Sequence, residues 1–212
     1  MKDSLEVYKK SIKNWEIGKH HLKRAEFKAK LINIKTGKLL DLGAFKGELE
    51  RFLPKEINYY PLDIFKIKHK NFKKCDLNKG KIPFSNNFFD YVVCTSILEH
   101  LLIEPNVILK EIYRVLKNKN NTALISLPND LGLNRIFYLI RNDNDIGTLE
   151  EQKYGRHHWF FTIKNSKKLL RKYFIIKNEI AFSGGVLPYF LKFPKQLSTE
   201  IYYICKKKIF LK

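Results

Sequence analysis

Short apolar runs separated by amphipathic or polar stretches dominate the middle of the chain, between residues 37 and 128. Each run is short and nearly continuous, which is typical of strands buried on both faces of a sheet. We expect strands at Lys38–Leu42, Ile57–Leu62, Phe89–Thr95 and Thr122–Leu127, and a weaker one at Asn71–Cys75. Two further strands are expected near the end of the chain, at Phe174–Phe182 and Glu200–Lys206.

Apolar residues at spacings of three and four predict the helices. Residues 4–34 are expected to form two helices broken near Gly18, as an N-terminal cap on one side of the domain. A helix from Lys46 to Leu53 ends before Pro54, and another is expected at Asn165–Tyr173. The helix at Pro105–Leu116 carries an apolar face made of Val107, Ile108, Ile112, Val115 and Leu116.

Strands that alternate with helices predict an α/β fold, a parallel sheet covered by helices on both faces. We expect a single domain over residues 1–212. Within it, residues 1–36 form the N-terminal helices and residues 37–128 a ligand-binding core. Residues 129–164 form an insertion or lid, and residues 165–212 the last helix and strands. The carboxyl ends of the strands, where such sheets bind ligands, fall at 43–47, 63–67, 76–88, 95–101 and 128–160.

Composition fits a packed domain and leaves the partner open. The chain has 212 residues, 44% of them hydrophobic, enough for one core. The formal charge is +20, with 34 lysines and 7 arginines spread along the chain. A solvated basic surface is the simplest interpretation, and nucleic acid or an anionic membrane surface is the alternative. No secretory signal or membrane-spanning run is recognisable, which predicts a cytoplasmic protein.

The cysteines predict neither a metal site nor a redox motif. Cys75, Cys94 and Cys205 stand far apart and form no C-x-x-C pair. We expect them to be small buried or half-buried residues in a reducing compartment.

The segment Asp41-Leu42-Gly43-Ala44-Phe45-Lys46-Gly47 carries the first candidate chemistry. A strand ends there, two glycines bracket a tight turn, and a helix begins. Glycine lets the backbone turn sharply and a ligand approach closely, while the amides of a helix start attract polar groups. Asp63 ends the next strand, where a carboxylate can accept both hydroxyl protons of a ribose. Together these features predict an adenosine-containing ligand, either a dinucleotide or S-adenosylmethionine.

Motifs further along the chain separate these two ligands. They are Asp76-Leu77, Ile82-Pro83-Phe84, Phe89-Asp90, Leu98-Glu99-His100, Glu111-Ile112-Tyr113-Arg114-Val115-Leu116-Lys117 and Pro128-Asn129. In this order they resemble the class I S-adenosylmethionine-dependent methyltransferases, specifically the small-molecule group called type 11. The resemblance is close over residues 37–130 and looser to about 182. It implies a Rossmann-like sheet of seven strands with the last one antiparallel, and the cofactor S-adenosylmethionine, with S-adenosylhomocysteine as its product.

The resemblance also implies roles by position. The turn residues Gly43, Ala44, Phe45 and Gly47 would lie beneath the methionine part of the cofactor, with Asp41 orienting the turn. Asp63 would hold the ribose, with Ile64 against the adenine. Asp76 would bind the adenine amino group beside Leu77, and Thr95 would lie near the sulfonium. Phe45 departs from the family, which commonly has glycine there; its side chain can crowd the cofactor or point away as a lid.

Two histidines are candidates for the base that takes a proton from the acceptor. His100 follows the fourth strand, and His157 lies in a segment that resembles the H-x-x-FFT of relatives associated with glycan or lipid modification. We favour His157, because His100 belongs to a segment that the resemblance ties to the cofactor side. A structural role is the alternative for each. The adjacent His157 and His158 lack a third ligand at recognisable spacing, so no metal site is predicted.

The acceptor side is expected in residues 129–160, which are too long and aromatic for a simple connector. Its wall would be formed by Phe137, Tyr138, Tyr154, Trp159 and Phe160, with core packing as the alternative. Residues 182–193 are unusually apolar and can cover a lipid-like substrate, rest on an anionic membrane, or pack against the N-terminal helices.

The sequence therefore predicts a methyltransferase for a small-molecule, glycan or lipid-linked acceptor, with oxygen as the attacked atom. One alternative is a nucleic-acid methyltransferase, supported by the charge alone. Another is a non-catalytic cofactor-binding partner protein, which the substitution at Phe45 suggests. A nicotinamide-dependent dehydrogenase is disfavoured by the stretch from Pro83 to Asp90. The oligomeric state cannot be deduced from the sequence.

Overall fold

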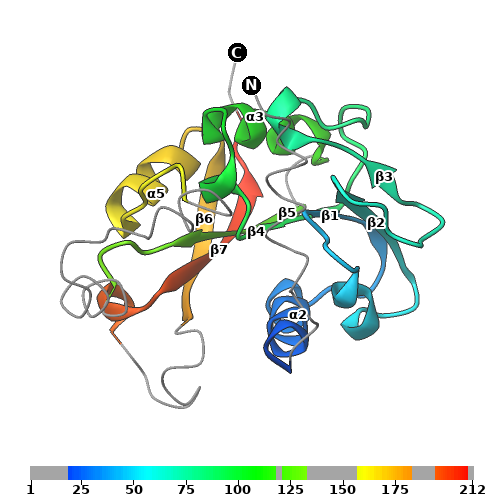
Figure 1. Cartoon of the computed structure of the whole chain (residues 1–212), viewed down its shortest axis with the longest axis horizontal. Helices are drawn as coiled ribbons and strands as arrows, with labels where there is room; N and C mark the ends of the chain where they lie inside the picture. Colours follow the sequence, from blue (N-terminus) through cyan, green and yellow to red (C-terminus); the bar gives the residue numbers. More distant parts are fainter. Residues whose placement is uncertain (1–18, 118–120, 133–156, 183–193, 210–212) are drawn as a thin grey trace.

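The computed structural model describes residues 19–117, 121–132, 157–182 and 194–209. Its centre is one seven-stranded sheet with the order β3-β2-β1-β4-β5-β7-β6 (Figure 1). The strands are β1 (Gly37–Leu42), β2 (Ile57–Asp63), β3 (Lys73–Lys74), β4 (Tyr91–Thr95), β5 (Thr122–Pro128), β6 (Phe174–Phe182) and β7 (Glu200–Lys207).

The strand directions agree with the predicted fold. Strands β1 to β5 pair in parallel, and β7 runs antiparallel to both of its neighbours, β5 and β6. From β1 the chain moves outward to β2 and β3 and then crosses back to β4 on the other side of β1. The order thus reverses between β1 and β4, and ligands of open α/β sheets bind at the carboxyl ends of the strands at such a point.

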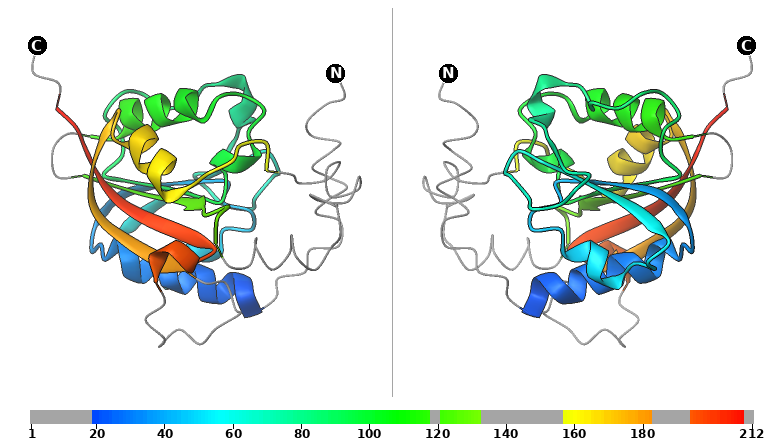
Figure 2. Two further views of the ribbon diagram at one scale, coloured as in Figure 1. Left: turned by 90° about the vertical axis from the view of Figure 1, so that its left-hand side faces the viewer. Right: turned by 90° about the vertical axis from the view of Figure 1, so that its right-hand side faces the viewer.

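Helices cover both faces of the sheet (Figures 1 and 2). One face carries α3 (Pro105–Val115) and α5 (Ile163–Leu170), and the other carries α2 (Lys19–Ile32). Because successive strand residues point to opposite faces, Leu40 of β1 packs in the cluster that includes α3. Leu39 packs in the cluster that includes the end of α2. The sheet is therefore buried from both sides, which explains why its strands are continuously apolar.

Helix α2 is tied to strand β7 by a long-range ion pair. Arg24 of α2 bonds to Glu200, the first residue of β7, and to the hydroxyl of Ser96, which follows β4, at 2.7 Å. The ring of Phe27 packs against Phe182 and Tyr202 with centroid distances of 5.2 and 5.3 Å. The helix thus holds the loop after β4 in place.

Two predicted elements are wrong in kind or extent. The helix expected from Lys46 to Leu53 is a short 3-10 helix, η1 (Glu48–Phe52). Gly47 before it is left-handed and Pro54 follows it, so only a few residues are free to be helical, a length typical of 3-10 turns. The strand expected at Asn71–Cys75 has shrunk to the two exposed residues of β3, at the sheet edge.

Helix α3 buries a face slightly different from the predicted one. Ile108, Leu109, Ile112 and Val115 are fully buried at spacings of three and four, whereas Val107 is 37% exposed. Val107 lies one position off this face and meets Gly80 instead, where an added Cβ would stand 3.2 Å from its Cγ1.

Several predictions lie outside the described residues. These are the first helix and the break at Gly18, residues 133–156 of the expected lid with Phe137, Tyr138 and Tyr154, and residues 183–193 of the apolar stretch. The cysteines behave as expected in their packing: Cys94 and Cys205 are buried, Cys75 is half-buried, and all three are free thiols.

Candidate functional site

The turn after β1 has the left-handed backbone that its glycines suggested. Gly43, Phe45 and Gly47 have φ values of 67°, 55° and 77°. The N–H groups of Gly43 and Ala44 both donate to the carbonyl of Leu62 in β2, at 2.8 and 3.2 Å. The turn is therefore fastened to the neighbouring strand, and it requires glycine-like backbone at three places, one of which this chain fills with phenylalanine.

The Phe45 side chain lies against α2. Its ring centroid is 5.8 Å from that of His21, and the Lys46 ammonium lies 5.3 Å from the ring. The residue is half-buried and keeps the left-handed conformation that glycine adopts more easily. The ring thus contacts the helix that covers this face of the sheet.

Asp63 organises the same turn from the end of β2. One carboxylate oxygen accepts a hydrogen bond from the Phe45 N–H at 2.8 Å, and the other accepts one from the Phe65 N–H at 2.9 Å. The side chain is buried, and this burial raises the pKa of Asp63 while the backbone hydrogen bonds oppose the rise. An ionised carboxylate offers about four acceptor positions, so the backbone N–H groups of Phe45, Ile64 and Phe65 still leave room for a ligand.

Asp41 lies in β1, two residues before the turn. It pairs with Pro61 of β2, which comes two residues before Asp63. Its carboxylate accepts a hydrogen bond of 2.7 Å from the Tyr59 hydroxyl, and burial raises its pKa. Buried Glu48, just after the turn, has one oxygen without a hydrogen-bond partner among the described residues. The two carboxylates make this end of the sheet acidic inside a strongly basic protein.

The strand register aligns the predicted cofactor residues. Leu42 pairs with Leu62 on one side and Cys94 on the other, so the next residues, Gly43, Asp63 and Thr95, follow in one row across three strands. The half-buried Ile64 comes directly after that row. The fold therefore brings the residues predicted for the ribose and the sulfonium to one edge of the sheet.

Asp76 and Leu77 lie in the loop after β3. Asp76 is half-buried and caps the short helix η2 (Leu77–Lys79) by accepting the Asn78 N–H at 3.0 Å, and Leu77 is buried. Asn78 in turn accepts the Leu102 N–H at 2.8 Å, which ties this loop to the one after β4.

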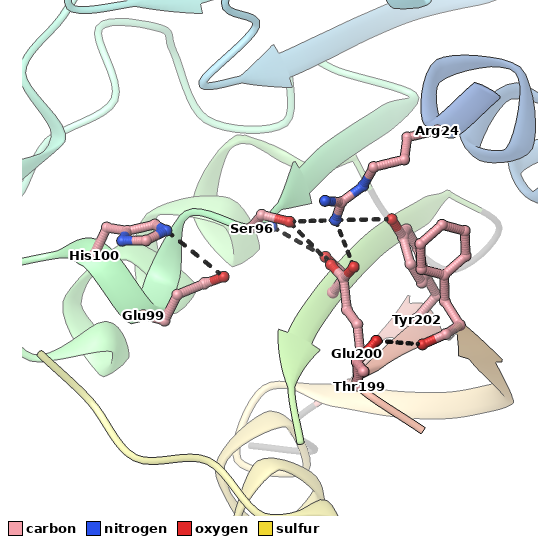
Figure 3. A network of polar contacts seen from close by, with 9 residues as sticks. Arg24, Ser96, Glu99, His100, Thr199, Glu200 and Tyr202 are labelled. Atoms are coloured by element: carbon pink, nitrogen blue, oxygen red, sulfur yellow. Dashed lines mark hydrogen bonds and ion pairs between the residues drawn. The ribbon is translucent and has the colours of Figure 1, made fainter. Parts of the chain in front are cut away.

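A buried polar network holds the loop that follows β4 (Figure 3). Ser96 has a left-handed backbone with φ of 55°. Its N–H donates to the Ser126 hydroxyl at 3.0 Å, and its hydroxyl donates to Glu200 at 2.9 Å. Arg24 completes the network from α2. The strained residue is thus held by four elements, β4, β5, β7 and α2, just before the short helix η3 (Leu98–His100).

The two candidate bases lie side by side. The ring centroids of His100 and His157 are 5.1 Å apart, although the residues are 57 positions apart in sequence. Glu99, which is 3% exposed, has a carboxylate oxygen 4.0 Å from Nε2 of His100, and Asp130 has one 3.7 Å from Nδ1 of His157. Burial raises the pKa of Glu99 to about 7. Two imidazoles therefore face two carboxylates at the carboxyl ends of β4 and β5.

The sequence missed two of these four groups. Glu99 was visible in the Leu98-Glu99-His100 motif, and Asp130 follows Pro128-Asn129, but neither was singled out. In the sequence, His157 and His158 have no third ligand at recognisable spacing, so no metal site was predicted. In space, the Glu99 carboxylate is a possible third ligand next to His100 and His157.

Two residues of the expected aromatic wall are described. Trp159 donates from Nε1 to the Leu101 carbonyl at 2.8 Å, and Phe160 is 59% exposed.

The residues present fit an adenosine-bearing cofactor. Three features lie at the point where the strand order reverses. They are the left-handed turn, its hydrogen bonds to β2, and the Asp63 carboxylate, which still has room to accept from a ligand. Such a combination suits a ligand that brings two neighbouring hydroxyls to a carboxylate. The fold and this edge of the sheet together define a class I methyltransferase.

Comparison with known families gives the same result. Residues 19–173 match the family described as methyltransferase domain, and the chain belongs to this family. S-adenosylmethionine, which becomes S-adenosylhomocysteine, is the cofactor that membership implies. The chain is also 35% identical over 108 residues to the uncharacterized protein MJ0638 of Methanocaldococcus jannaschii. That match covers 48% of this chain and spans 45% of the relative's length.

Solved structures share the fold at low sequence identity. One is the Burkholderia thailandensis 1,6-didemethyltoxoflavin-N1-methyltransferase with S-adenosylhomocysteine, at a TM-score of 0.66 and 15% identity, covering 97% of this chain and 85% of that one. Another is a complex from Haloferax volcanii of the Trm112 methyltransferase activator with a putative methyltransferase. Its TM-score is 0.64 and its sequence identity 14%, and the match covers 99% of this chain and 97% of that one.

Among helices in the described part of this chain, none is long and apolar enough to cross a membrane.

Proposed function

We propose that the protein transfers the methyl group of S-adenosylmethionine to a hydroxyl oxygen of a small-molecule, glycan or lipid-linked acceptor. The observation that carries the proposal is the contact between His100 and His157 at the carboxyl edge of the sheet, the same edge at which the row of Gly43, Asp63 and Thr95 lies. A weakly acidic hydroxyl needs a base when it attacks, and imidazole titrates near neutral pH.

Within this proposal the turn and the end of β2 hold the cofactor. Asp63 accepts the ribose hydroxyls while it keeps the turn in place through Phe45. Ile64 and Leu77 flank the adenine, Asp76 accepts from its amino group, and Asp41 supports the turn from below. The bound cofactor supplies an activated methyl group on a sulfonium, so the protein mainly has to align the acceptor with it.

The acceptor side follows from where the histidines lie. His157 takes the proton of the acceptor hydroxyl, and the nearby Asp130 carboxylate stabilises the imidazolium that results. The described segment from His157 to Phe161 borders the acceptor, and Trp159 holds it to the Leu101 carbonyl. A nitrogen acceptor is the second candidate, because the Burkholderia neighbour is by its name an N1-methyltransferase. An activator protein like the one crystallised with the Haloferax neighbour is a candidate partner.

Calorimetry with S-adenosylmethionine, S-adenosylhomocysteine and NAD tests the cofactor. We expect both sulfur ligands to bind with micromolar affinity in order of magnitude, and NAD not to bind. Asp63→Ala should weaken S-adenosylhomocysteine by about 1.5–3 kcal/mol, because charge-assisted hydrogen bonds to the ribose are lost. Preference for NAD would end the proposal, and unchanged affinity in folded Asp63→Ala would mean that the ribose lies elsewhere.

A further inference from the structure

Glu99, His100 and His157 form a cluster with a feature that base catalysis does not need. One ligand atom from each of the three side chains, two imidazole nitrogens and a carboxylate oxygen, lies within 4.8 Å of the others. Two imidazoles and one carboxylate are a donor set that first-row transition metals prefer.

Backbone contacts on both sides place His157 in this cluster. The N–H of the next residue, His158, donates to the Glu99 carbonyl at 2.7 Å. Asp130 and Phe161 exchange hydrogen bonds, with the Phe161 N–H on the Asp130 carboxylate at 2.6 Å and the Asp130 N–H on the Phe161 carbonyl at 2.8 Å. The segment that begins at His157 therefore lies between the loops after β4 and β5. These hydrogen bonds bring His157 close to Glu99.

The carboxylate of Glu99 is the part of the cluster that points to a ligand. The Glu99 side chain is 4% exposed, and its Oε2 has no hydrogen-bond partner among the described residues. Figure 3 shows the contact that joins the Glu99 carboxylate to the His100 ring. A buried carboxylate oxygen left without a partner is costly, and a coordinated cation removes that cost.

Asp130 gives His157 the outer partner that metal-binding histidines have. Its carboxylate lies 3.7 Å from Nδ1 of His157 and is itself buried, at 8% exposure of the residue. Ligating histidines usually direct their second nitrogen to a carboxylate, which fixes the ring and raises its basicity. The His100 and His157 side chains are 25% and 43% exposed, so the site is open to water on one side.

We propose that Glu99, His100 and His157 bind one divalent first-row transition-metal ion, with Asp130 as the outer-shell carboxylate. Three protein ligands with an exposed side leave a coordination position for an oxygen atom, as in catalytic rather than structural metal sites. The consequence for catalysis rests on the proposed function. A bound ion would act as a Lewis acid that lowers the pKa of a coordinated acceptor hydroxyl, while Glu99, His100 and His157 would hold the ion.

Titration of tag-free, chelator-treated full-length protein with Zn²⁺ tests the binding itself, and the absorption of bound Co²⁺ reports its ligand geometry. We expect one equivalent of Zn²⁺ bound with a micromolar or tighter dissociation constant. His157→Ala and Glu99→Gln should each weaken binding by about 100-fold or more, and Asp130→Asn by about 10- to 100-fold. His158→Ala is the matched control, because it removes a neighbouring exposed histidine and keeps the backbone N–H, so binding should be unchanged.

Three results would overturn the metal site: no stoichiometric Zn²⁺ binding, equal loss in His158→Ala and His157→Ala, or undiminished binding in Glu99→Gln. Calorimetry of S-adenosylhomocysteine on the same samples keeps this failure separate from failure of the proposed function. Protein that binds S-adenosylhomocysteine but no metal leaves the methyltransferase proposal intact. Protein that binds the metal but not S-adenosylhomocysteine contradicts the proposed function and leaves the site standing.

Discussion

At the scale of single residues, the two glycines of the turn after β1 are needed for different reasons. Both have left-handed backbone, which costs another residue about 1–2 kcal/mol. A Cβ on Gly43 would also lie 2.0 Å from Cδ1 of Ile97, whereas the nearest atom to a Cβ on Gly47 is 3.8 Å away. Gly43 is therefore required by contact and conformation, and Gly47 by conformation alone.

This difference predicts unequal losses in two alanine variants. Gly47→Ala should lower the free energy of unfolding by the backbone cost, and Gly43→Ala by about 1 kcal/mol more, because Ile97 must move. Both variants alter the turn that holds the cofactor, and Gly43→Ala should weaken S-adenosylhomocysteine more, since Ile97, which it displaces, lies in the loop that follows Thr95. Urea unfolding and calorimetry measure both effects. Equal losses would show that Ile97 adapts without cost.

The histidine pair leads to the second prediction at this scale. If His157 assists deprotonation of the acceptor, either as the base or by holding a metal ion, His157→Ala should lower turnover by about 100-fold and leave cofactor affinity intact. His158→Ala should keep the activity. Steady-state kinetics with an identified acceptor decide the matter: a raised Michaelis constant with unchanged turnover would mean that His157 only latches the segment beside it.

At the scale of elements, Arg114 shows how α3 fixes the loop before β4. Its guanidinium bonds to both Glu111 oxygens at 2.7 Å, and to the carbonyls of Phe84 at 2.7 Å and Ile82 at 2.8 Å. Glu111 also accepts the Ile82 N–H at 2.9 Å. The Glu-x-x-Arg motif thus fastens residues 82–84 to the helix. From the sequence, this motif had been interpreted only as part of the family resemblance, and the structure gives it a structural role.

This clamp predicts a pH-dependent stability difference. Hydrogen bonds from Arg114 lower the pKa of Glu111, so the stability it contributes is present above the unfolded carboxyl pKa and is lost as pH falls through the lower folded value. Glu111→Gln should therefore cost about 1–2 kcal/mol at pH 7, and the gap to the wild type should close in acid. Urea unfolding at several pH values measures it, and a gap that is constant with pH would contradict the argument.

The elements that the sequence predicted well are those specified by local pattern. The strands β1, β2, β4 and β5 and the helix α3 have apolar periods that need no knowledge of their neighbours. The edge strand β3 and the 3-10 helix η1 were misjudged, because a few residues can satisfy either structure and tertiary contacts decide. The Asp41–Gly47 turn and Asp63 were predictable from chemistry at strand ends. The meeting of Glu99 with His157 was not, because it depends on hydrogen bonds between loops far apart in the chain.

At the scale of the whole molecule, the carboxyl edge of the sheet collects acidic groups in a basic protein. Asp41, Glu48, Asp63 and Glu99 are all buried at this edge, while the formal charge of the chain is +20. The ligand site is therefore built with acidic side chains, whereas the chain as a whole is basic. This separation argues that the lysines serve the surface and that the site itself selects a ligand with hydroxyl or amino donors.

The last prediction tests whether the net charge marks a nucleic-acid substrate. Lysines that are distributed over the surface, without a defined binding site, should bind any phosphate polymer weakly. Counterion release alone should drive this binding. We expect a random-sequence RNA 20-mer to bind at about 50 mM salt and to lose about 1000-fold in affinity by about 200 mM. It should show no preference among sequences and accept no methyl group. Fluorescence anisotropy against salt, and transfer of a radiolabelled methyl group to the RNA, make the two measurements. Salt-resistant, sequence-selective binding with methylation would instead favour a nucleic-acid methyltransferase over the small-molecule enzyme, because salt resistance requires contacts beyond the phosphates.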